Sequence, residues 1–394
     1  MDRPTVRLRP KADARRIRHG FPWAYADEVV LDRRTRALDP GTIVRLEDGE
    51  RRPLGIAALN PVSRIAVRML DRDPEASVDR GWLRARMAAA WAHRERLGLA
   101  PWCRVVHAEA DGLPGVVVDA FGEAVVIQPN AAWAEAMLEP LAEAVRAVTG
   151  ATVVVKGAGG RARGLEGLDD VSAVLSGALD GPVEVPMNGA VYAADLTGGQ
   201  KTGLFYDQRP NHAFAARLAR GAVLDVFSHV GGFGLAMLAA GAERVLCVDS
   251  SAPALSLAER GAAATGVSGR LETRRADAFE TLAALGTEGR RFEVVVCDPP
   301  AFAPAKPARE AGLRAYERLA RLTAPLVEPG GYLVLCSCSH AVDLAAFREA
   351  SVRGVGRGGR ASQIVRTGFA GPDHPVHPLL AETGYLKALF LRLL

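Results

Sequence analysis

The stretch that most constrains the fold is residues 222–250, which read AVLDVFSHVGGFGLAMLAAGAERVLCVDS. Its first part, Ala222–Val226, is an apolar, β-branched run of the kind that forms a buried parallel strand. A helix is expected over Leu235–Ala240, and a second strand over Val245–Val248 ends on Asp249. The stretch therefore predicts a βαβ unit with a glycine-rich turn and an acid at the tip of its second strand.

The turn between the first strand and the helix contains Gly231, Gly232 and Gly234. Glycines let backbone approach a ligand closely, and a carboxylate at the second strand tip can accept hydrogen bonds from ribose hydroxyls. The spacing is not G-x-G-x-x-G, which cradles a pyrophosphate, so it favours S-adenosylmethionine over a dinucleotide. A turn that binds no ligand is the alternative interpretation, and the tips of the later strands decide between the two.

Those later strands extend the alternation of strand and helix, and polar residues follow several of them. Strands are expected at Leu271–Arg275, Phe292–Cys297, Tyr332–Cys336, Ser362–Thr367 and Tyr385–Leu393. The final pair has no full crossover helix between its members, which indicates a seven-stranded sheet whose last strand is antiparallel. This is the architecture of class I, Rossmann-like methyltransferases, an α/β fold.

Four acids now fall at successive strand tips of this sheet, which chance turn chemistry explains poorly. Asp225 and the Gly231–Gly232 backbone would face the methionine part of S-adenosylmethionine, and Asp249 would bind the ribose. Asp277 with Ala278 would bracket the adenine and bond its exocyclic amine. Asp298 opens the rigid turn Asp298-Pro299-Pro300-Ala301-Phe302, which can grip the edge of a planar base.

The fifth strand leaves through Cys336-Ser337-Cys338-Ser339-His340, next to the Asp298 tip. A thiolate there suits methylation of a pyrimidine carbon, because its addition at carbon 6 of cytosine makes carbon 5 nucleophilic. Alternation puts Cys336 and Cys338 on the same side of the strand, so spacing does not choose between them. Cys338, beyond the apolar run, is the predicted nucleophile, with Asp298 as the second catalytic residue; two structural cysteines are the alternative.

Length and charge place a second kind of module before this sheet. The 394 residues allow two or three domains, and residues 1–100 hold 21 Lys and Arg against 14 Asp and Glu, a net charge of +7. Short alternating strands predict a small β-barrel over residues 1–73, a central α/β domain over 74–186, and the methyltransferase domain over 187–394. Within the central domain, the glycine-rich, basic stretch 157–167 is expected to be a mobile loop.

The first hundred residues are basic enough to indicate a polyanionic partner. Arg15, Arg16 and Arg18 precede the aromatic segment His19-Gly20-Phe21-Pro22-Trp23-Ala24-Tyr25. We expect the arginines to contact an RNA backbone and Phe21 and Trp23 to fill the core, while a solvated Arg-rich surface is the alternative.

The five cysteines are odd in number and include no C-x-x-C, so they predict reduced thiols and no metal site. The first residues lack the apolar segment of a signal peptide, and the longest uncharged run is broken by glycines. A cytoplasmic protein without a membrane partner is expected.

At this point the sequence resembles the RlmI-type bacterial 23S rRNA (cytosine-5)-methyltransferases, which carry an N-terminal PUA domain. The resemblance spans essentially the whole chain. Its motifs are Gly20-Phe21-Pro22-Trp23, the run from Leu59 to Leu70, the linker from Gly199 to Arg209, Phe227-Ser228-His229-Val230-Gly231-Gly232-Phe233, D-P-P-x-F and S-C-S. His229-Val230 departs from the family's Tyr-Thr.

The resemblance implies a PUA barrel, a methyltransferase domain, Cys338 as nucleophile, and large-subunit ribosomal RNA, naked or partly assembled, as the partner. It also implies that part of the linker helps enclose the cofactor. The full set predicted to bind S-adenosylmethionine is Gln200, Phe205, Asp207, Arg209, Asp225, Phe227, Gly231, Gly232, Asp249, Ser250, Asp277, Ala278 and Asp298.

Two other functions stay open on the sequence. A guanine nitrogen-7 or other non-covalent RNA methyltransferase on the same scaffold would need no cysteine. A non-enzymatic RNA-binding protein with a relic methyltransferase fold is disfavoured by the intact set of acids. The target nucleotide and the oligomeric state, homodimer included, also stay open.

Overall fold

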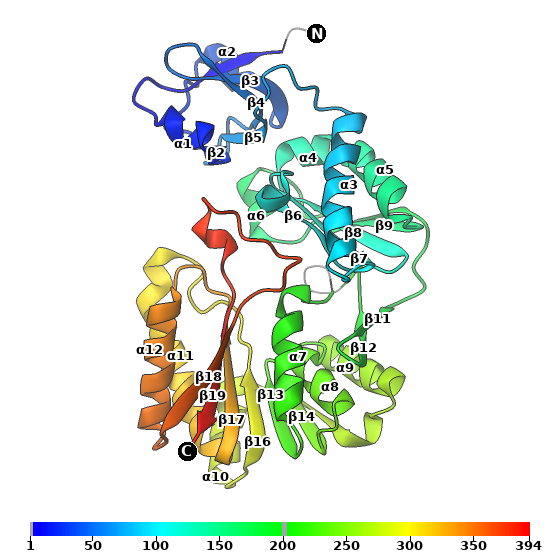
Figure 1. Cartoon of the computed structure of the whole chain (residues 1–394), viewed down its shortest axis with the longest axis vertical. Coiled ribbons are helices and arrows are strands. Elements are labelled where there is room, and N and C mark those ends of the chain that lie inside the picture. The colour runs from blue at the N-terminus through cyan, green and yellow to red at the C-terminus, as the bar shows by residue number, and fades with distance from the viewer. Residues whose placement is uncertain (1–2, 199–202) are drawn as a thin grey trace. The chain divides into compact units, whose positions relative to one another are not determined.

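The computed structural model describes residues 3–198 and 203–394 (Figure 1). The chain forms two compact units. Unit 1 comprises residues 1–181, 196–203 and 375–380, and unit 2 comprises residues 182–195, 204–374 and 381–394.

The N-terminal part of unit 1 is built on a five-stranded sheet in the order β1-β3-β4-β5-β2. Apolar residues that alternate along these strands form its core, which includes Val44, Leu46 and Val67. The elements of this part are β1 (Thr5–Arg7), α1 (Ala14–Arg18), β2 (Trp23–Ala24), α2 (Arg33–Arg36), β3 (Thr42–Glu47), β4 (Pro53–Leu59) and β5 (Val67–Asp71). Short strands, as predicted for this region from its alternating pattern, are therefore present.

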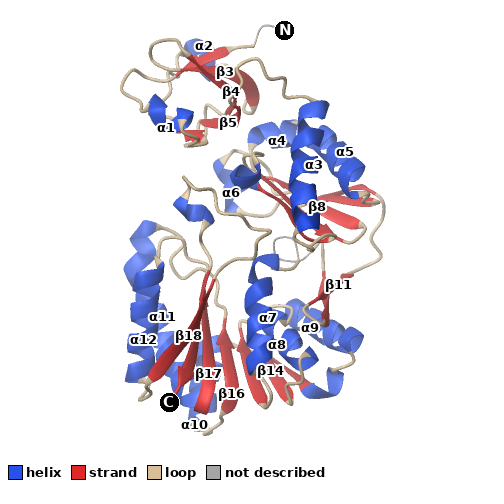
Figure 2. Ribbon diagram, in the orientation of Figure 1, coloured by secondary structure: helices blue, strands red, loops and turns tan. Residues whose placement is uncertain are grey.

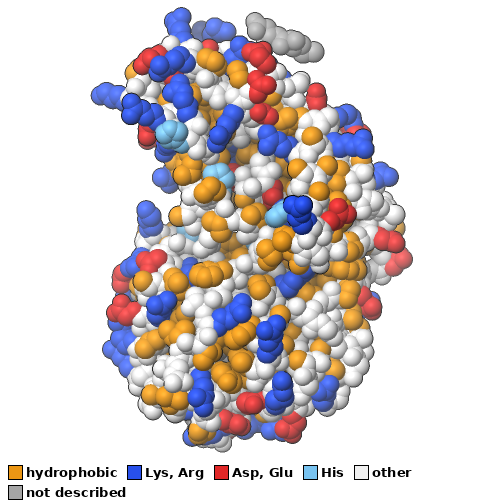
Figure 3. All heavy atoms as spheres, in the orientation of Figure 1, with side chains coloured by type: hydrophobic (Ala, Val, Ile, Leu, Met, Phe, Trp, Pro, Cys, Tyr) orange, Lys and Arg blue, Asp and Glu red, His pale blue; other side chains and the backbone are white. Residues whose placement is uncertain are grey.

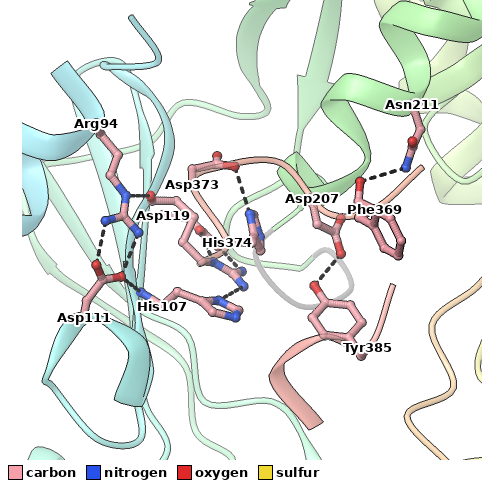
Figure 4. A network of polar contacts seen from close by, with 11 residues as sticks. Arg94, His107, Asp111, Asp119, Asp207, Asn211, Phe369, Asp373, His374 and Tyr385 are labelled. Atoms are coloured by element: carbon pink, nitrogen blue, oxygen red, sulfur yellow. Dashed lines mark hydrogen bonds and ion pairs between the residues drawn. The ribbon is translucent and has the colours of Figure 1, made fainter. Parts of the chain in front are cut away.

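The second part of unit 1 is a sheet in the order β10-β9-β8-β7-β6 with helices packed against it (Figure 2). Its core extends into the N-terminal sheet, because Ala58 and Leu70 belong to the same apolar cluster as Trp133. The elements are α3 (Arg80–Arg96), β6 (Trp102–His107), β7 (Val116–Phe121), β8 (Ala124–Pro129), α4 (Ala132–Ala136), α5 (Leu138–Thr149), β9 (Val153–Lys156), α6 (Arg161–Leu165) and β10 (Ala173–Ser176). Asp111 makes a bidentate ion pair with the buried Arg94 (Figure 4).

The prediction of a mobile loop over 157–167 is wrong for Arg161–Leu165, which form α6. Arg163 on this helix is buried and donates to the Pro129 carbonyl oxygen at 2.6 Å and to Glu135 at 2.9 Å. The hydrogen bonds of this buried guanidinium hold the segment in place, although its glycine content had predicted mobility.

A buried carboxylate, Glu166, joins the two sheets of unit 1. Its oxygens accept hydrogen bonds from Asn60 Nδ2 at 3.0 Å, Ser63 Oγ at 2.9 Å and Arg68 at 3.0 Å. These three residues all lie in the family motif that runs from Leu59 to Leu70. Part of that motif is therefore explained by packing inside unit 1.

Unit 2 is organised around a seven-stranded sheet in the order β15-β14-β13-β16-β17-β19-β18. All its pairings are parallel except those made by β19, which runs antiparallel to β17 and β18. The strands are β13 (Ala222–Val226), β14 (Arg244–Asp249), β15 (Leu271–Arg275), β16 (Phe292–Cys297), β17 (Val327–Ser337), β18 (Ser362–Gly368) and β19 (Lys387–Leu393). A separate hairpin, β11 (Val183–Met187) and β12 (Ala190–Ala194), precedes them.

The seven-stranded sheet and its antiparallel last strand are as predicted. The strand β17 begins five residues earlier than expected, because Val327 already pairs with Phe292. The Pro329-Gly330-Gly331 segment lies within the strand, where the pairing register shifts.

Helices cover both faces of this sheet (Figure 2). They are α7 (Arg209–Leu218), α8 (Gly232–Ala239), α9 (Ala252–Thr265), α10 (Ala278–Thr287), α11 (Arg309–Thr323) and α12 (Leu344–Arg357). The chain moves outward from β13 to β14 and β15 and then returns to β16 on the other side of β13. Ligands of such sheets bind at the carboxyl ends of the strands beside this reversal. A ligand site is therefore expected at the tips of β13, β14, β16 and β17.

Candidate active site

The glycine turn after β13 is shaped by close packing as well as by backbone conformation. Gly231 precedes α8 with φ of 79°, a left-handed conformation that favours glycine. A Cβ at Gly234 would lie 2.9 Å from Cys247 Sγ on β14, so only glycine lets α8 pack this closely on the sheet. Two neighbours, Phe227 and His229, have φ of 61° and 50°, which is unusual for residues with side chains. Such backbone strain concentrates at functional sites.

Asp225, in the same strand, is a buried acid with an incomplete set of partners. Its Oδ2 accepts a hydrogen bond from Gly234 N at 2.8 Å, whereas Oδ1 has no partner among the described residues. Burial, together with the neighbouring Asp298 and Asp249, raises the pKa of Asp225 to about 8, although the hydrogen bond from Gly234 N acts in the opposite direction. The mutual influence of these three acids places the tips of β13, β14 and β16 around one site.

Asp249 ends β14, and both of its carboxylate oxygens accept hydrogen bonds from backbone N–H groups. Its Oδ2 accepts from His229 N at 2.9 Å and its Oδ1 from Ser251 N at 2.8 Å. It therefore fixes the strained turn after β13, and the exposed Ser250 follows it. A carboxylate has about four lone-pair positions, so both oxygens keep capacity for a further donor.

Asp277 caps the N-terminus of α10, where its Oδ1 accepts from Glu280 N at 2.9 Å. Ala278 beside it is buried, and Phe279 contacts Phe227 and Phe302, with ring centroids 6.4 and 6.1 Å away. This aromatic cluster links the tips of β13, β15 and β16. The structure thus shows Asp277 as a helix cap near the predicted site, a role that the sequence did not distinguish from adenine binding.

The turns after β16 and β17 are joined by hydrogen bonds. Ser339 Oγ accepts from Ala303 N at 3.0 Å and lies 2.9 Å from the hydroxyl of Tyr316, which also accepts from Ser337 Oγ. Both serines of the S-C-S motif are thus anchored by one tyrosine of α11. Between them, the Cys338 thiol donates to the Pro299 carbonyl oxygen across 3.9 Å.

The two candidate cysteines differ in exposure, which the sequence spacing could not establish. Cys336 is fully buried within β17, and burial raises the pKa of its thiol well above the usual value, with Asp298 acting in the same direction. Cys338 is partly exposed, whereas the other four cysteines are buried. Only Cys338 combines solvent access with a position at the Asp298-Pro299 turn.

Residues of the linker from Gly199 to Arg209 contact the turn after β13 and the segment before β19, and the sequence did not predict these contacts. Asp207 is buried, and its Oδ2 accepts from the Tyr385 hydroxyl at 2.5 Å (Figure 4). The ring of Phe205 lies 5.0 Å from that of His229, and the guanidinium of Arg209 lies 5.1 Å from the Tyr206 ring. Gln200, another predicted cofactor ligand, lies outside the described residues.

Gln208 was missed as a site residue, although it lies in the linker motif. Its Nε2 donates to Asp298 Oδ2 at 2.9 Å, and its Oε1 accepts from Asn211 Nδ2 at 2.6 Å. Asn211 also donates to the Phe369 carbonyl oxygen at 3.2 Å (Figure 4). The only sequence signal was the polar run Asp207-Gln208-Arg209 ahead of the first strand, which does not say which member faces the acid.

The three arginines predicted to contact RNA differ in their partners. Arg16 forms an ion pair with Glu28 and Arg18 with Asp48, both at 2.5 Å. Arg15 is exposed. Lys and Arg side chains gather over α1 and α2 on the face shown in Figure 3, so the basic character of this region is a surface property.

The sheet order, the reversal beside β13 and the acids at its tips define a class I methyltransferase. Comparison with known proteins agrees: residues 107–371 match the S-adenosylmethionine-dependent methyltransferase family, and residues 6–72 match a PUA-like domain. This is an S-adenosylmethionine-dependent methyltransferase with a PUA-like N-terminal domain.

Among curated proteins, the chain is 36% identical to a ribosomal RNA large subunit methyltransferase of Deinococcus radiodurans, over 99% of this chain and 98% of the relative. It is 33% identical to the ribosomal RNA large subunit methyltransferase I of Shewanella denitrificans, over 98% of each chain. The chain belongs to this ribosomal RNA large subunit methyltransferase I family.

Two solved structures share the whole fold. One is a Streptococcus mutans protein described as a SAM-dependent methyltransferase, with a TM-score of 0.82, 17% identity, and coverage of 99% of this chain and 100% of the other. The second was solved in complex with SAH and has the same TM-score and identity over 100% of both chains. At this identity the likeness concerns the fold.

In the described parts of the chain, no helix is long and apolar enough to cross a membrane. The same residues contain no cluster of three or more His, Cys, Asp or Glu side chains able to hold a metal ion.

Proposed function

We propose that the protein forms 5-methylcytosine in large-subunit ribosomal RNA, with Cys338 as a covalent nucleophile. S-adenosylmethionine supplies the methyl group, and the RNA supplies an extruded cytosine. The observation that carries the proposal is the placement of the partly exposed Cys338 thiol 3.9 Å from the Pro299 carbonyl oxygen, at the turn that begins with Asp298.

The chemistry assigned to the cysteine follows from the weak nucleophilicity of cytosine carbon 5. The Cys338 thiolate would add to carbon 6, which gives carbon 5 the electron density needed to accept a methyl group. A base then removes the carbon 5 proton and the cysteine leaves. This scheme requires the sulfur to reach the base from the same side as the Asp298 turn, which the shared hydrogen bonds of Ser339 support.

Asp298 would accept a hydrogen bond from the exocyclic amine of the cytosine and, as a carboxylic acid, donate one to ring nitrogen 3. Its Oδ2 is occupied by the Gln208 amide, so the carboxyl is oriented before the base enters. Gln208 is in turn held by Asn211. In this proposal Gln208 and Asn211 are positioning residues, because they act on the base only through Asp298.

The cofactor site proposed for S-adenosylmethionine is the set given by the sequence. The unpartnered Oδ1 of Asp225 fits the ammonium group of the methionine part, since a buried carboxyl oxygen without a donor is costly unless a ligand satisfies it. Asp249 would receive the ribose hydroxyls, and Phe227, Phe279 and Ala278 would contact the adenine. Phe205, Asp207, Arg209 and Gln200 would enclose the cofactor from the linker side.

The RNA partner is proposed from the PUA-like domain and from the names of the relatives. The target cytosine has to leave its stack, so a looped or single-stranded site, in naked or partly assembled RNA, is the expected substrate. We also propose a cytoplasmic location and domain boundaries after residues 73 and 186. Arg15, Arg16 and Arg18 are proposed to contact the RNA backbone.

The test is methylation of large-subunit RNA by Cys338→Ala, followed by mass mapping of methylated nucleotides. We expect carbon 5 methylation to fall by at least about a thousandfold, as expected when a covalent nucleophile is removed. Cys336→Ala is the paired variant: its activity should stay within the range explained by any loss of folded protein. Full carbon 5 methylation by Cys338→Ala would overturn the proposal.

The second candidate, a guanine nitrogen-7 methyltransferase, makes the opposite prediction. Nitrogen 7 is itself nucleophilic, so its methylation would be indifferent to Cys338→Ala. The observation in favour of cytosine is the exposure of Cys338 alone among five thiols. Mapping of the methylated base in the wild-type product separates the two candidates directly.

A further inference from the structure

Lys387 is a buried cation next to the proposed nucleophile that none of the functions above uses. It is the first residue of β19 and pairs with Ser337 of β17, the residue before Cys338. Only 4% of its surface is exposed. Burying a charged lysine costs free energy unless hydrogen bonds or an opposite charge compensate the lost hydration, so the contacts of Lys387 are informative.

The ammonium group of Lys387 holds the backbone that follows the cysteine. Its Nζ donates to the Ser339 carbonyl oxygen at 2.8 Å and to the Val342 carbonyl oxygen at 2.7 Å. These two bonds use two of its three N–H donors. Together with the Tyr316 hydroxyl, which engages the side chains of Ser337 and Ser339, they fix both flanks of Cys338.

The charge of Lys387 is not balanced by an ion pair in the described parts of the chain. Burial lowers its pKa to about 8, while interaction with Cys338 and Asp343 opposes that change. Asp343 is engaged elsewhere, because it caps α12 and contacts Arg309 at 3.5 Å. Among the described residues at these strand tips, the further titratable groups are Tyr316, Cys336, Asp298 and His340, which follows the thiol by two residues.

We propose that Lys387 is a positioning residue for Cys338: it fixes the turn that carries the sulfur and supplies the positive charge that stabilises its thiolate. On ionisation the S–H bond breaks, the electron pair stays on sulfur, and the proton passes to water, while Lys387 keeps its own proton. The link to methyl transfer rests on the proposed function, but the effect on the thiol does not.

The experiment measures alkylation of Cys338 by iodoacetamide as a function of pH, followed on the peptide by mass spectrometry. In the full-length Lys387→Met protein, the pH of half-maximal reactivity should rise by about one unit, and the rate at pH 7 should fall about tenfold. Lys387→Arg should restore most of the wild-type profile. Lys306→Met, which removes an exposed cation of unit 2, is the matched control and should change nothing.

A uniform change in rate with an unshifted pH profile would mean that Lys387 only shapes the turn, and would overturn the proposal. If Lys387→Met does not fold, the wild-type protein provides the decision. The difference in thiolate absorbance between wild type and Cys338→Ala should show half-ionisation below about pH 8.5, the value of a free cysteine. Half-ionisation at or above that pH would equally overturn it.

The same data separate this inference from the proposed function. If Lys387→Met shifts the alkylation profile while Cys338→Ala still methylates carbon 5, the covalent mechanism fails and the Lys387 inference stands. If Cys338→Ala loses methylation but the alkylation profile of Lys387→Met matches wild type, the covalent mechanism stands and the Lys387 inference fails.

Discussion

Two buried carboxyl groups, Glu166 in unit 1 and Asp225 in unit 2, differ in how completely their oxygens are hydrogen-bonded. Glu166 accepts hydrogen bonds from Asn60, Ser63 and Arg68. Burial opposes its ionisation, but these partners prevail and lower its pKa. Asp225 has one backbone donor and an oxygen without a partner, and burial raises its pKa to about 8. The acid with the incomplete set of hydrogen-bond partners is the one proposed to contact the cofactor.

The largest expected effect is on the structural member of this pair. Glu166→Ala should destabilise unit 1 by about 3–5 kcal/mol, because it leaves the largely covered Arg68 without one of its two carboxylate partners and removes the carboxylate that accepts from Asn60 and Ser63. Equilibrium unfolding in urea measures the loss. Glu95→Ala, at an exposed position of α3, should change the unfolding free energy by less than about 0.5 kcal/mol. A Glu166 variant as stable as wild type would remove the contrast with Asp225.

Asp225→Asn should leave stability nearly unchanged near pH 4, where the acid is neutral, and should weaken binding of S-adenosylmethionine at pH 7 by about one hundredfold. The amide keeps an acceptor for Gly234 N, but it cannot provide the negative charge proposed to meet the ammonium group. Calorimetric titration measures the affinity, and thermal unfolding without cofactor measures the stability. Unaltered affinity would show that the unpartnered oxygen is not a ligand position.

The raised pKa of Asp225 also predicts a pH dependence. A folded-state pKa of about 8, against 3.8 in the unfolded chain, means that the folded protein holds an extra proton between these values. Its contribution to stability is full below about pH 4 and is lost as the pH rises through about 8. We expect the melting temperature of the cofactor-free wild type to fall relative to Asp225→Asn over this interval. Parallel profiles would contradict the assigned pKa.

Binding of the cofactor should also release a proton from Asp225 at pH 7. Calorimetry in buffers of different ionisation enthalpy measures this release, which should disappear above about pH 9 and in Asp225→Asn. A release that persists in the variant would have to come from another group.

The smallest effect is expected at the N-terminal arginines, which lie on the surface. Replacing Arg15, Arg16 and Arg18 together by alanine should lower the salt slope of RNA binding by up to about three, roughly one for each phosphate contact. Arg15→Ala alone should give about one, because Arg15 is exposed. Binding measured over a series of salt concentrations checks this, and an unchanged slope would place the RNA contact elsewhere.

The sequence predicted the seven-stranded sheet well because its signals are local. Apolar runs bounded by acids and glycines define β13, β15 and β16 to the residue. The tips of these strands are also predictable, since parallel strands with right-handed crossovers bring their carboxyl ends to one edge.

Other parts of the site depend on contacts between distant segments, which no local pattern encodes. Gln208 reaches Asp298 across 90 residues of sequence, and Lys387 reaches Ser339 across 48. The sequence chose Cys338 because it lies beyond the apolar run, but the difference in exposure between its thiol and that of Cys336 is visible only in the structure. Likewise, the glycines of residues 157–167 predicted a mobile loop, whereas the hydrogen bonds of the buried Arg163 stabilise part of that segment as α6.

The hydroxyl of Ser339 has a consequence for attempts to redesign this enzyme. It bonds both Tyr316 and Ala303 N, the residue directly after D-P-P-A-F, and so connects that turn to the segment S-C-S. A graft that transplants either segment alone from a relative would disconnect them and lose the spacing between sulfur and carboxyl. Recombination between family members should therefore tolerate crossovers before residue 298 or after residue 339, and fail for those that separate the two.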